Sequence, residues 1–159
     1  MDARIDPQTR DLTTIAPGEH PQMPPVTPHL TIRGAARAIA FYEQAFGATE
    51  DIRMLAEDGE RLMHACVTIN GGKVMLADEF PEFDHCGAVA APSLDRPAPV
   101  AVAISYARAR EVDEIYARAV SAGCAGVLEP HDAFWGDRFA VLCDPFGHRW
   151  LLAGPLDPG

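Results

Sequence analysis

The feature that most constrains the fold of this chain is a tandem repeat, in which two successive segments predict the same order of elements. In residues 26–80, VTPHLTIRG predicts a strand, AARAIAFYEQAFGA a helix, and EDIRMLAEDG, RLMHACVTING and KVMLADE three further strands. In residues 99–154, the same order is predicted by VAVAISY, AREVDEIYARAVSAG, GVLEPHDAFWG and RFAVLCDPFGHRWLLAG. Duplicated units of this kind share one core. We therefore predict an α+β fold of two tandem βαβββ units.

Glycine and proline positions mark the boundaries of these predicted elements. Asn70-Gly71 separates two predicted strands and is typical of a tight hairpin turn. Gly47 and Gly123 follow the two predicted helices, where a helix commonly ends. Residues 81–98 contain several prolines and predict a linker loop between the units.

The two ends of the chain lie outside the repeat. Residues 1–25 contain several prolines and show no apolar period, so we expect a mobile N-terminal tail. Residues 155–159 form a short C-terminal tail. The predicted organisation is therefore a first unit at 26–80, a linker at 81–98 and a second unit at 99–154.

Charge and cysteine content limit the partners and the compartment of the chain. There are 23 Asp and Glu residues against 13 Lys and Arg residues, and this net charge of -10 repels nucleic acid and anionic membrane surfaces. No apolar run reaches membrane-spanning length, so we expect no membrane partner and a cytoplasmic location. The cysteines form no CxxC pair and favour buried thiols over a disulfide framework, at Cys66, Cys86, Cys124 and Cys143.

Two motifs within this repeat identify a related family. With FYEQAFGA in the first unit and DPFGHRW in the second, the chain resembles the vicinal oxygen chelate superfamily. That superfamily includes glyoxalase I, the bleomycin-resistance proteins and the extradiol dioxygenases. The segments VTPHLTIRGAARAIAFYEQAFGA, MHACVTINGGKVMLADE and FWGDRFAVLCDPFGHRWLLA resemble its PhnB-like branch. The resemblance implies a curved mixed sheet around a cleft, and a homodimer.

The resemblance also implies where a metal ion would be held. Metal-dependent members take four ligands from the first and last strands of each unit, and the matching positions here are Thr27, Leu76, Ala101 and Leu151. None of these residues supplies a carboxylate, imidazole or thiolate, so we expect no divalent metal and no other cofactor.

A metal site displaced by two residues along the strands is the alternative. Side chains alternate between the two faces of a strand, so such a shift keeps the cleft face. It brings in His29 and Asp78 from the first unit, and Ala103 and Arg149 from the second. At most two of these residues are metal ligands, which makes a poor site.

Five residues are candidates for binding a ligand in the cleft, and each has a structural alternative. They are His29, Thr31, Asp78, Trp135 and Arg149. His29 is either a hydrogen-bonding or acid–base group, or a histidine packed beside Pro28. Asp78 lies at a strand end, where acids are commonly only solvated. Trp135 is either an aromatic wall for the ligand or the lid of a turn centred on Gly136.

The remaining motifs near the C-terminus favour structural roles over catalytic ones. Asp144-Pro145-Phe146-Gly147 has the composition of a turn. By strand alternation, His148 and Trp150 share a face opposite Leu151, so we expect both to pack toward the helices or a partner. No histidine base is placed by sequence beside a cysteine, so we expect no nucleophilic cysteine.

Three functional hypotheses follow. The first is a metal-free protein, similar to the bleomycin-resistance members, that binds a small, partly apolar molecule in the cleft. The second is a metal-dependent lyase or isomerase of the glyoxalase class with a displaced site that uses His29 and Asp78. The third is a protein-interaction module without a small ligand. No catalytic residue is assigned from the sequence.

Overall fold

A computed structural model describes residues 22–83 and 90–157. The predicted tail at 1–25 and the predicted linker at 81–98 therefore lie partly outside the described residues. The first unit contains β1 (His29–Ile32), α1 (Ala35–Phe46), β2 (Thr49–Leu55), β3 (Leu62–Ile69) and β4 (Gly72–Asp78). A short 3-10 helix, η1 (Pro81–Phe83), follows it. The second unit contains β5 (Ala101–Ser105), α2 (Ala109–Ala122), β6 (Ala125–Asp132), β7 (Asp137–Cys143) and β8 (Arg149–Pro155).

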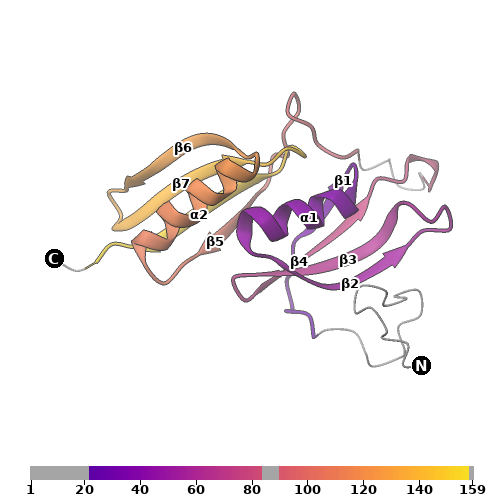
Figure 1. The fold of residues 1–159 in the computed structure, drawn as a ribbon, viewed down its shortest axis with the longest axis horizontal. Helices are drawn as coiled ribbons and strands as arrows, with labels where there is room; N and C mark the ends of the chain where they lie inside the picture. The colour runs from indigo at the N-terminus through magenta and orange to yellow at the C-terminus, as the bar shows by residue number, and fades with distance from the viewer. Residues whose placement is uncertain (1–21, 84–89, 158–159) are drawn as a thin grey trace, which may run out of the picture.

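The two units have the same topology. The strand orders are β1-β4-β3-β2 and β5-β8-β7-β6, and the sheets lie side by side along the long axis of the molecule (Figure 1). In each sheet the first strand is parallel to the last, and the other neighbours are antiparallel. The predicted α+β fold of two βαβββ units is confirmed. Within one chain, however, the strands form two separate four-stranded sheets instead of one continuous curved sheet.

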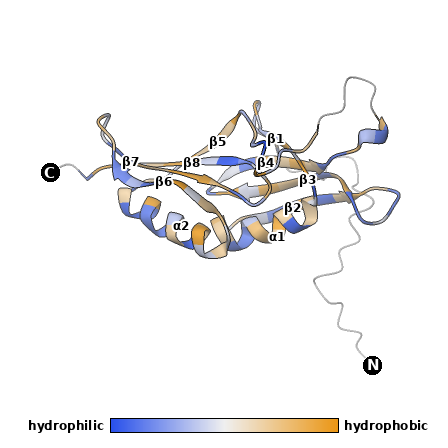
Figure 2. Cartoon of the chain, turned by 90° about the horizontal axis from the view of Figure 1, so that it is seen from above, coloured by the Kyte–Doolittle hydropathy of each residue, from blue (hydrophilic) through white to orange (hydrophobic). Residues whose placement is uncertain are grey.

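Both helices cover the same side of the two sheets, as Figure 2 shows. The buried residues of α1 recur at helical spacing and include Ala38, Ile39 and Tyr42, so one face of this helix is apolar. In α2, Val112 and Ala119 are fully buried. Ile115 and Tyr116, in the middle of α2, pack against the core as partly buried residues.

Backbone conformations at the predicted breaks explain where the elements end. Gly47 has φ 66° and its N–H donates to the carbonyl of Tyr42, which ends α1 in a left-handed residue. Asn70 and Gly71 have φ 47° and 80°, the two positive values that a type I′ hairpin turn requires. Both breaks agree with the sequence prediction.

The turn between β7 and β8 is organised by the buried carboxylate of Asp144. Its Oδ1 accepts backbone N–H groups from Phe146 and His148, each at 2.9 Å. Its Oδ2 accepts the hydroxyl of Tyr42 at 2.7 Å and the indole N–H of Trp150 at 3.0 Å. Because Tyr42 lies on α1 and Trp150 on β8, one side chain joins the two units.

None of the described helices is long and apolar enough to cross a membrane.

Removal of the Asp144 carboxylate is expected to destabilise the whole chain. In Asp144→Ala, four donors lose their acceptor in the core, and the free energy of unfolding falls by about 3 to 5 kcal/mol. Tyr42→Phe removes one of these bonds and costs about 1 kcal/mol. Urea unfolding followed by circular dichroism measures both changes.

The matched control is Asp95→Ala, because Asp95 is an exposed residue of the linker. This change is expected to stay within about 0.5 kcal/mol of the unsubstituted chain. An Asp144→Ala protein as stable as this control contradicts the assigned role of the carboxylate.

Candidate functional site

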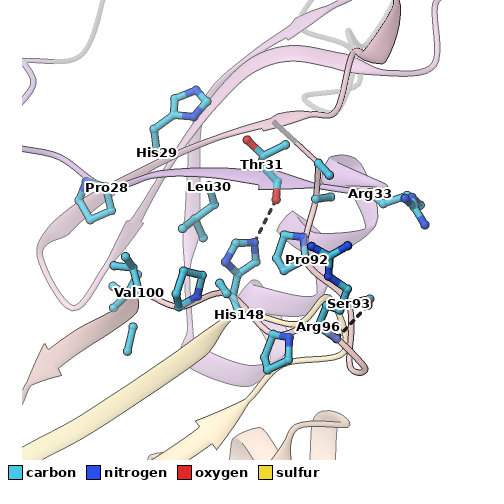
Figure 3. A pocket seen from close by; sticks show the side chains of 17 residues that line it. Pro28, His29, Leu30, Thr31, Arg33, Pro92, Ser93, Arg96, Val100 and His148 are labelled. Atoms are coloured by element: carbon cyan, nitrogen blue, oxygen red, sulfur yellow. Dashed lines mark hydrogen bonds between the residues drawn. The ribbon is translucent and has the colours of Figure 1, made fainter. Parts of the chain in front are cut away.

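A cavity of about 670 Å³ lies where the two units and the linker meet. Its walls come from residues around β1, from linker residues 90–93 and 96–98, and from residues 99–102 at the start of β5, together with His148 (Figure 3). The lining is largely apolar, and includes Pro28, Leu30, Pro92, Pro97, Val100 and Val102. Small-molecule sites of soluble proteins have this size and this mainly apolar character.

His29 and Thr31 of β1 line the cavity, as do Ala101 of β5 and the backbone around it. In β1, Leu30 and Ile32 belong to the buried core under α1, so the side chains of His29 and Thr31 point to the opposite face. The ring of His29 stacks on that of His64, with 6.3 Å between ring centroids. The sequence therefore places His29 and Thr31 on the correct side of β1.

His148 is the most enclosed polar side chain of the cavity, with 5% of its surface exposed. Its Nε2 lies 3.1 Å from the backbone oxygen of Thr31, and Figure 3 shows the ring between Leu30 and Pro92. A carbonyl oxygen only accepts, so Nε2 must carry the proton. In the neutral ring Nδ1 is then an acceptor, and it has no hydrogen-bond partner among the described residues.

Sequence reasoning missed this role of His148. Alternation from Leu151 indicates only that the side chain points away from the cleft face of β8. The structure places His148 just before β8, in the turn that Asp144 organises, and there it reaches across to the backbone of β1. The Asp-Pro-Phe-Gly turn was the available signal, because the residue after such a turn is held by the turn and not by the sheet.

Two arginines, Arg33 and Arg96, lie at the cavity, and their surroundings differ. Arg33 donates to Glu79 at 2.6 Å, and this hydrogen bond holds the pKa of the Glu79 carboxyl below its usual value. The second oxygen of Glu79 accepts the backbone N–H of Ala91 at 2.8 Å, so Glu79 also fixes the linker wall. The guanidinium of Arg96 has no acceptor in the described part of the chain.

The expected placement of Asp78 on the cleft face is wrong. Its Oδ1 accepts the N–H groups of Gly34 and Ala35 at the start of α1, at 2.8 and 3.1 Å. Its Oδ2 accepts the N–H of Leu62 at 2.8 Å. Asp78 is 8% exposed and faces the helix, opposite to His29, because it shares its strand face with Leu76. The carboxylate caps a helix and is not available to a ligand.

Trp135 and Arg149 do not contribute to this cavity as the structure describes it. Trp135 lies in the turn after β6, where its indole N–H donates to Asp137 at 3.0 Å and its ring packs on Phe139. The side chain is 52% exposed. Arg149 is an exposed residue at the start of β8. The turn interpretation therefore describes Trp135 better than the ligand-wall interpretation does.

The family's metal positions do not converge in this chain. Thr27 precedes β1, and its hydroxyl donates to the carbonyl of Pro24 at 3.1 Å. Leu76 is fully buried under α1, so the predicted register of β4 is wrong by one residue. Ala101 and Leu151 lie half-buried on the face opposite the core, as expected.

The residues present do not fit a metal ion of the family type. The displaced alternative fails as well, because His29 and Asp78 point to opposite faces of the first sheet. Among the described residues, no three His, Cys, Asp or Glu side chains are grouped so that they could hold an ion.

Comparisons with known proteins agree on one family. The family model "Glyoxalase/Bleomycin resistance protein/Dioxygenase superfamily" matches residues 23–152. The uncharacterized protein Rv0887c of Mycobacterium tuberculosis is 40% identical over 134 residues, 84% of this chain and 75% of that protein. TioX from Micromonospora sp. ML1 is 23% identical with a TM-score of 0.61, covering 84% of this chain and 98% of its own.

A second solved structure bears on the branch of the family. The PhnB protein from Bacillus cereus is 18% identical with a TM-score of 0.61, covering 82% of this chain and 99% of its own. At these identities the structural likenesses show the fold alone. The PhnB-like branch stays a prediction.

The described cysteines are not suited to act as nucleophiles. Burial raises the pKa of the Cys66 thiol to about 11 and that of Cys124 to about 12. Burial also raises the pKa of Cys143. The thiolate is the reactive form, so all three are less reactive than a free thiol near neutral pH. Cys86 lies outside the described residues.

Slow alkylation of the folded chain at pH 8 is the expected consequence. A pKa of about 11 for Cys66 leaves a thiolate fraction roughly 200-fold smaller than that of an ordinary cysteine. In a Cys86→Ser variant, iodoacetamide is expected to label the remaining thiols rapidly in urea and very slowly without it. Mass spectrometry of timed samples measures both rates, and equal labelling of Cys66 in the two conditions contradicts the prediction.

Proposed function

This chain belongs to the glyoxalase/bleomycin resistance protein/dioxygenase superfamily, and from that premise we propose that it is a metal-free protein that binds a small, partly apolar molecule. The binding site is the cavity between β1, the linker and β5. The observation that carries the proposal is His148, a nearly buried imidazole that lines a largely apolar cavity.

The walls of the cavity favour an apolar body in the ligand. Most of the lining residues are prolines, alanines and other aliphatic residues of the segment around β1, the linker and the start of β5. Burial of apolar surface stabilises a complex by roughly 25 cal/mol for each Å² removed from water. Rigid prolines lose little conformational entropy on binding, so this wall is well suited to hold a ligand.

His148 supplies orientation and selectivity. Its Nε2 donates to the carbonyl of Thr31, so Nδ1 of the neutral ring is an acceptor without a partner among the described residues. A ligand hydroxyl or N–H group satisfies this acceptor. A purely apolar ligand removes Nδ1 from water without a replacement hydrogen bond, which costs about 1 to 3 kcal/mol. The site therefore favours a ligand that carries one donor on an apolar frame.

The donor set supports the metal-free part of the proposal. Threonine, leucine and alanine occupy the family's ligand positions, and Asp78 is used as a helix cap. A divalent ion needs carboxylate, imidazole or thiolate ligands that converge on one point. The described side chains offer no such convergence.

Blocking the cavity is expected to abolish ligand binding. N-phenyl-naphthylamine is an uncharged apolar dye with one N–H group, and its fluorescence rises in an apolar site. We expect saturable binding that Ala101→Phe weakens by at least about tenfold, because the larger ring fills the space at a lining position. Fluorescence titration measures the dissociation constant.

The matched control for this experiment is Ala103→Phe. Ala103 lies two residues along β5, on the same face, but it is exposed and does not line the described cavity. Equal loss of binding in both variants, or no binding to the unsubstituted chain, contradicts the proposed site. Thermal unfolding of each variant confirms that it is folded.

Divalent metals are expected not to stabilise the folded chain. An ion held at a hundred times its dissociation constant adds about 2.7 kcal/mol to the free energy of unfolding. Thermal unfolding with Mg²⁺, Mn²⁺, Ni²⁺ or Zn²⁺, each repeated with EDTA, measures any such gain. Stabilisation that EDTA reverses contradicts the metal-free proposal.

A further inference from the structure

We propose that the natural ligand of this cavity is an organic acid, an apolar body that carries one anionic group, and that Arg96 binds this group. The inference rests on the proposed function, because it names the chemical class of the molecule held by the same cavity. Arg96 belongs to the linker and lines the cavity with the apolar residues described above.

The backbone of Arg96 is held in a turn of the linker that is closed by hydrogen bonds. The N–H of Ser93 donates to the carbonyl of Arg96 at 3.0 Å, and the N–H of Arg96 donates to the carbonyl of Ser93 at 3.1 Å. The hydroxyl of Ser93 also accepts the N–H of Arg96, at 3.3 Å. Reciprocal bonds of this kind fix the position from which the long side chain starts.

The same turn is attached to the second unit. The N–H of Ala98 donates to the carbonyl of Gly147 at 2.8 Å. Gly147 has φ 88°, and a Cβ atom there would lie 2.6 Å from the carbonyl oxygen of Ser93. Only glycine allows this approach, and the approach places the turn of Arg96 against the residue that precedes His148.

The two arginines at the cavity differ in whether their guanidinium group already forms an ion pair. Arg33 is paired with Glu79, and Figure 3 shows its side chain extending away from His148. Arg96 has no carboxylate partner among the described residues, and no Asp or Glu is among the described residues that line the cavity. Arg96 is an exposed residue, so its unpaired guanidinium at a largely apolar cavity is available to a bound anion.

The net negative charge of the chain limits the places where an anion can bind, and the guanidinium of Arg96 is one positive group at the cavity. At a net charge of -10, the surface as a whole repels anions. An acid is then retained only where a guanidinium and an apolar wall act together. The planar guanidinium donates two parallel hydrogen bonds to a carboxylate or sulfonate, which is its preferred geometry.

Two dyes with the same aromatic body distinguish the contribution of the anionic group to binding from that of the apolar body. Anilinonaphthalene sulfonate is the anionic probe, and N-phenyl-naphthylamine is the uncharged probe. In Arg96→Gln, we expect the dissociation constant for the sulfonate dye to rise about fivefold to tenfold. The constant for the uncharged dye is expected to change less than about twofold.

The matched control is Arg110→Gln, which removes the same charge from an exposed position of α2. It is expected to leave both constants unchanged. A higher NaCl concentration is expected to weaken binding of the sulfonate dye to the unsubstituted chain, because salt screens the charge of the guanidinium. The same increase is expected to change binding to Arg96→Gln much less.

The outcomes distinguish the two proposals. If both dyes bind and Ala101→Phe blocks both, but Arg96→Gln changes neither, the acid-binding inference is overturned and the proposed function stands. An equal effect of Arg96→Gln and Arg110→Gln on the sulfonate dye also overturns the inference. If neither dye responds to Ala101→Phe, the proposed function itself is overturned.

Discussion

The buried carboxylate of Asp144 is the interaction on which the rest of the structure depends. A charge removed from water is tolerated only when its hydrogen-bonding capacity is filled, and here four donors fill it. Those donors come from α1, from the turn and from β8, so the carboxylate fixes how the two units meet. The same turn holds His148 against the backbone of β1, and its Gly147 carbonyl accepts a hydrogen bond from the linker. The cavity exists because these three segments are held together.

Two adjacent acidic residues, which could be taken for catalytic groups, have structural roles in this chain. Asp78 caps the start of α1 and the start of β3, while Glu79 pairs with Arg33 and holds Ala91 of the linker. Both carboxylates accept hydrogen bonds from neighbours in the same chain, so both hold the structure together. Several polar side chains line the cavity, and of its two arginines only Arg33 is paired with a carboxylate of the described residues, that of Glu79.

The sequence predicts the repeat, the helices and the hairpin turn because hydrophobic period and glycine positions are local signals. It puts His29 and Thr31 on the face of β1 that lines the cavity, and their role in ligand binding stays a prediction. It fails at Leu76 and Asp78, because alternation needs an anchor and the core under α1 sets that anchor. Arg96 and His148 lie in a linker and a turn, where no period exists. Both residues line the same cavity, and this placement depends on long-range contacts that only the folded chain shows.

The location of the recognition groups has a consequence for how this fold acquires ligands. Strand positions that face the core cannot change without loss of packing, whereas linker residues are constrained mainly by their backbone bonds. In this chain the turn of Ser93 and Arg96 is closed by its own backbone and by Gly147, so the side chain of Arg96 is free to vary. If Arg96 binds the anionic group of the ligand as we propose, a different residue at that position alters the ligand's charge preference while Asp144 and the core stay intact. The same two units can therefore hold chemically different molecules, which is why the fold by itself does not name the ligand.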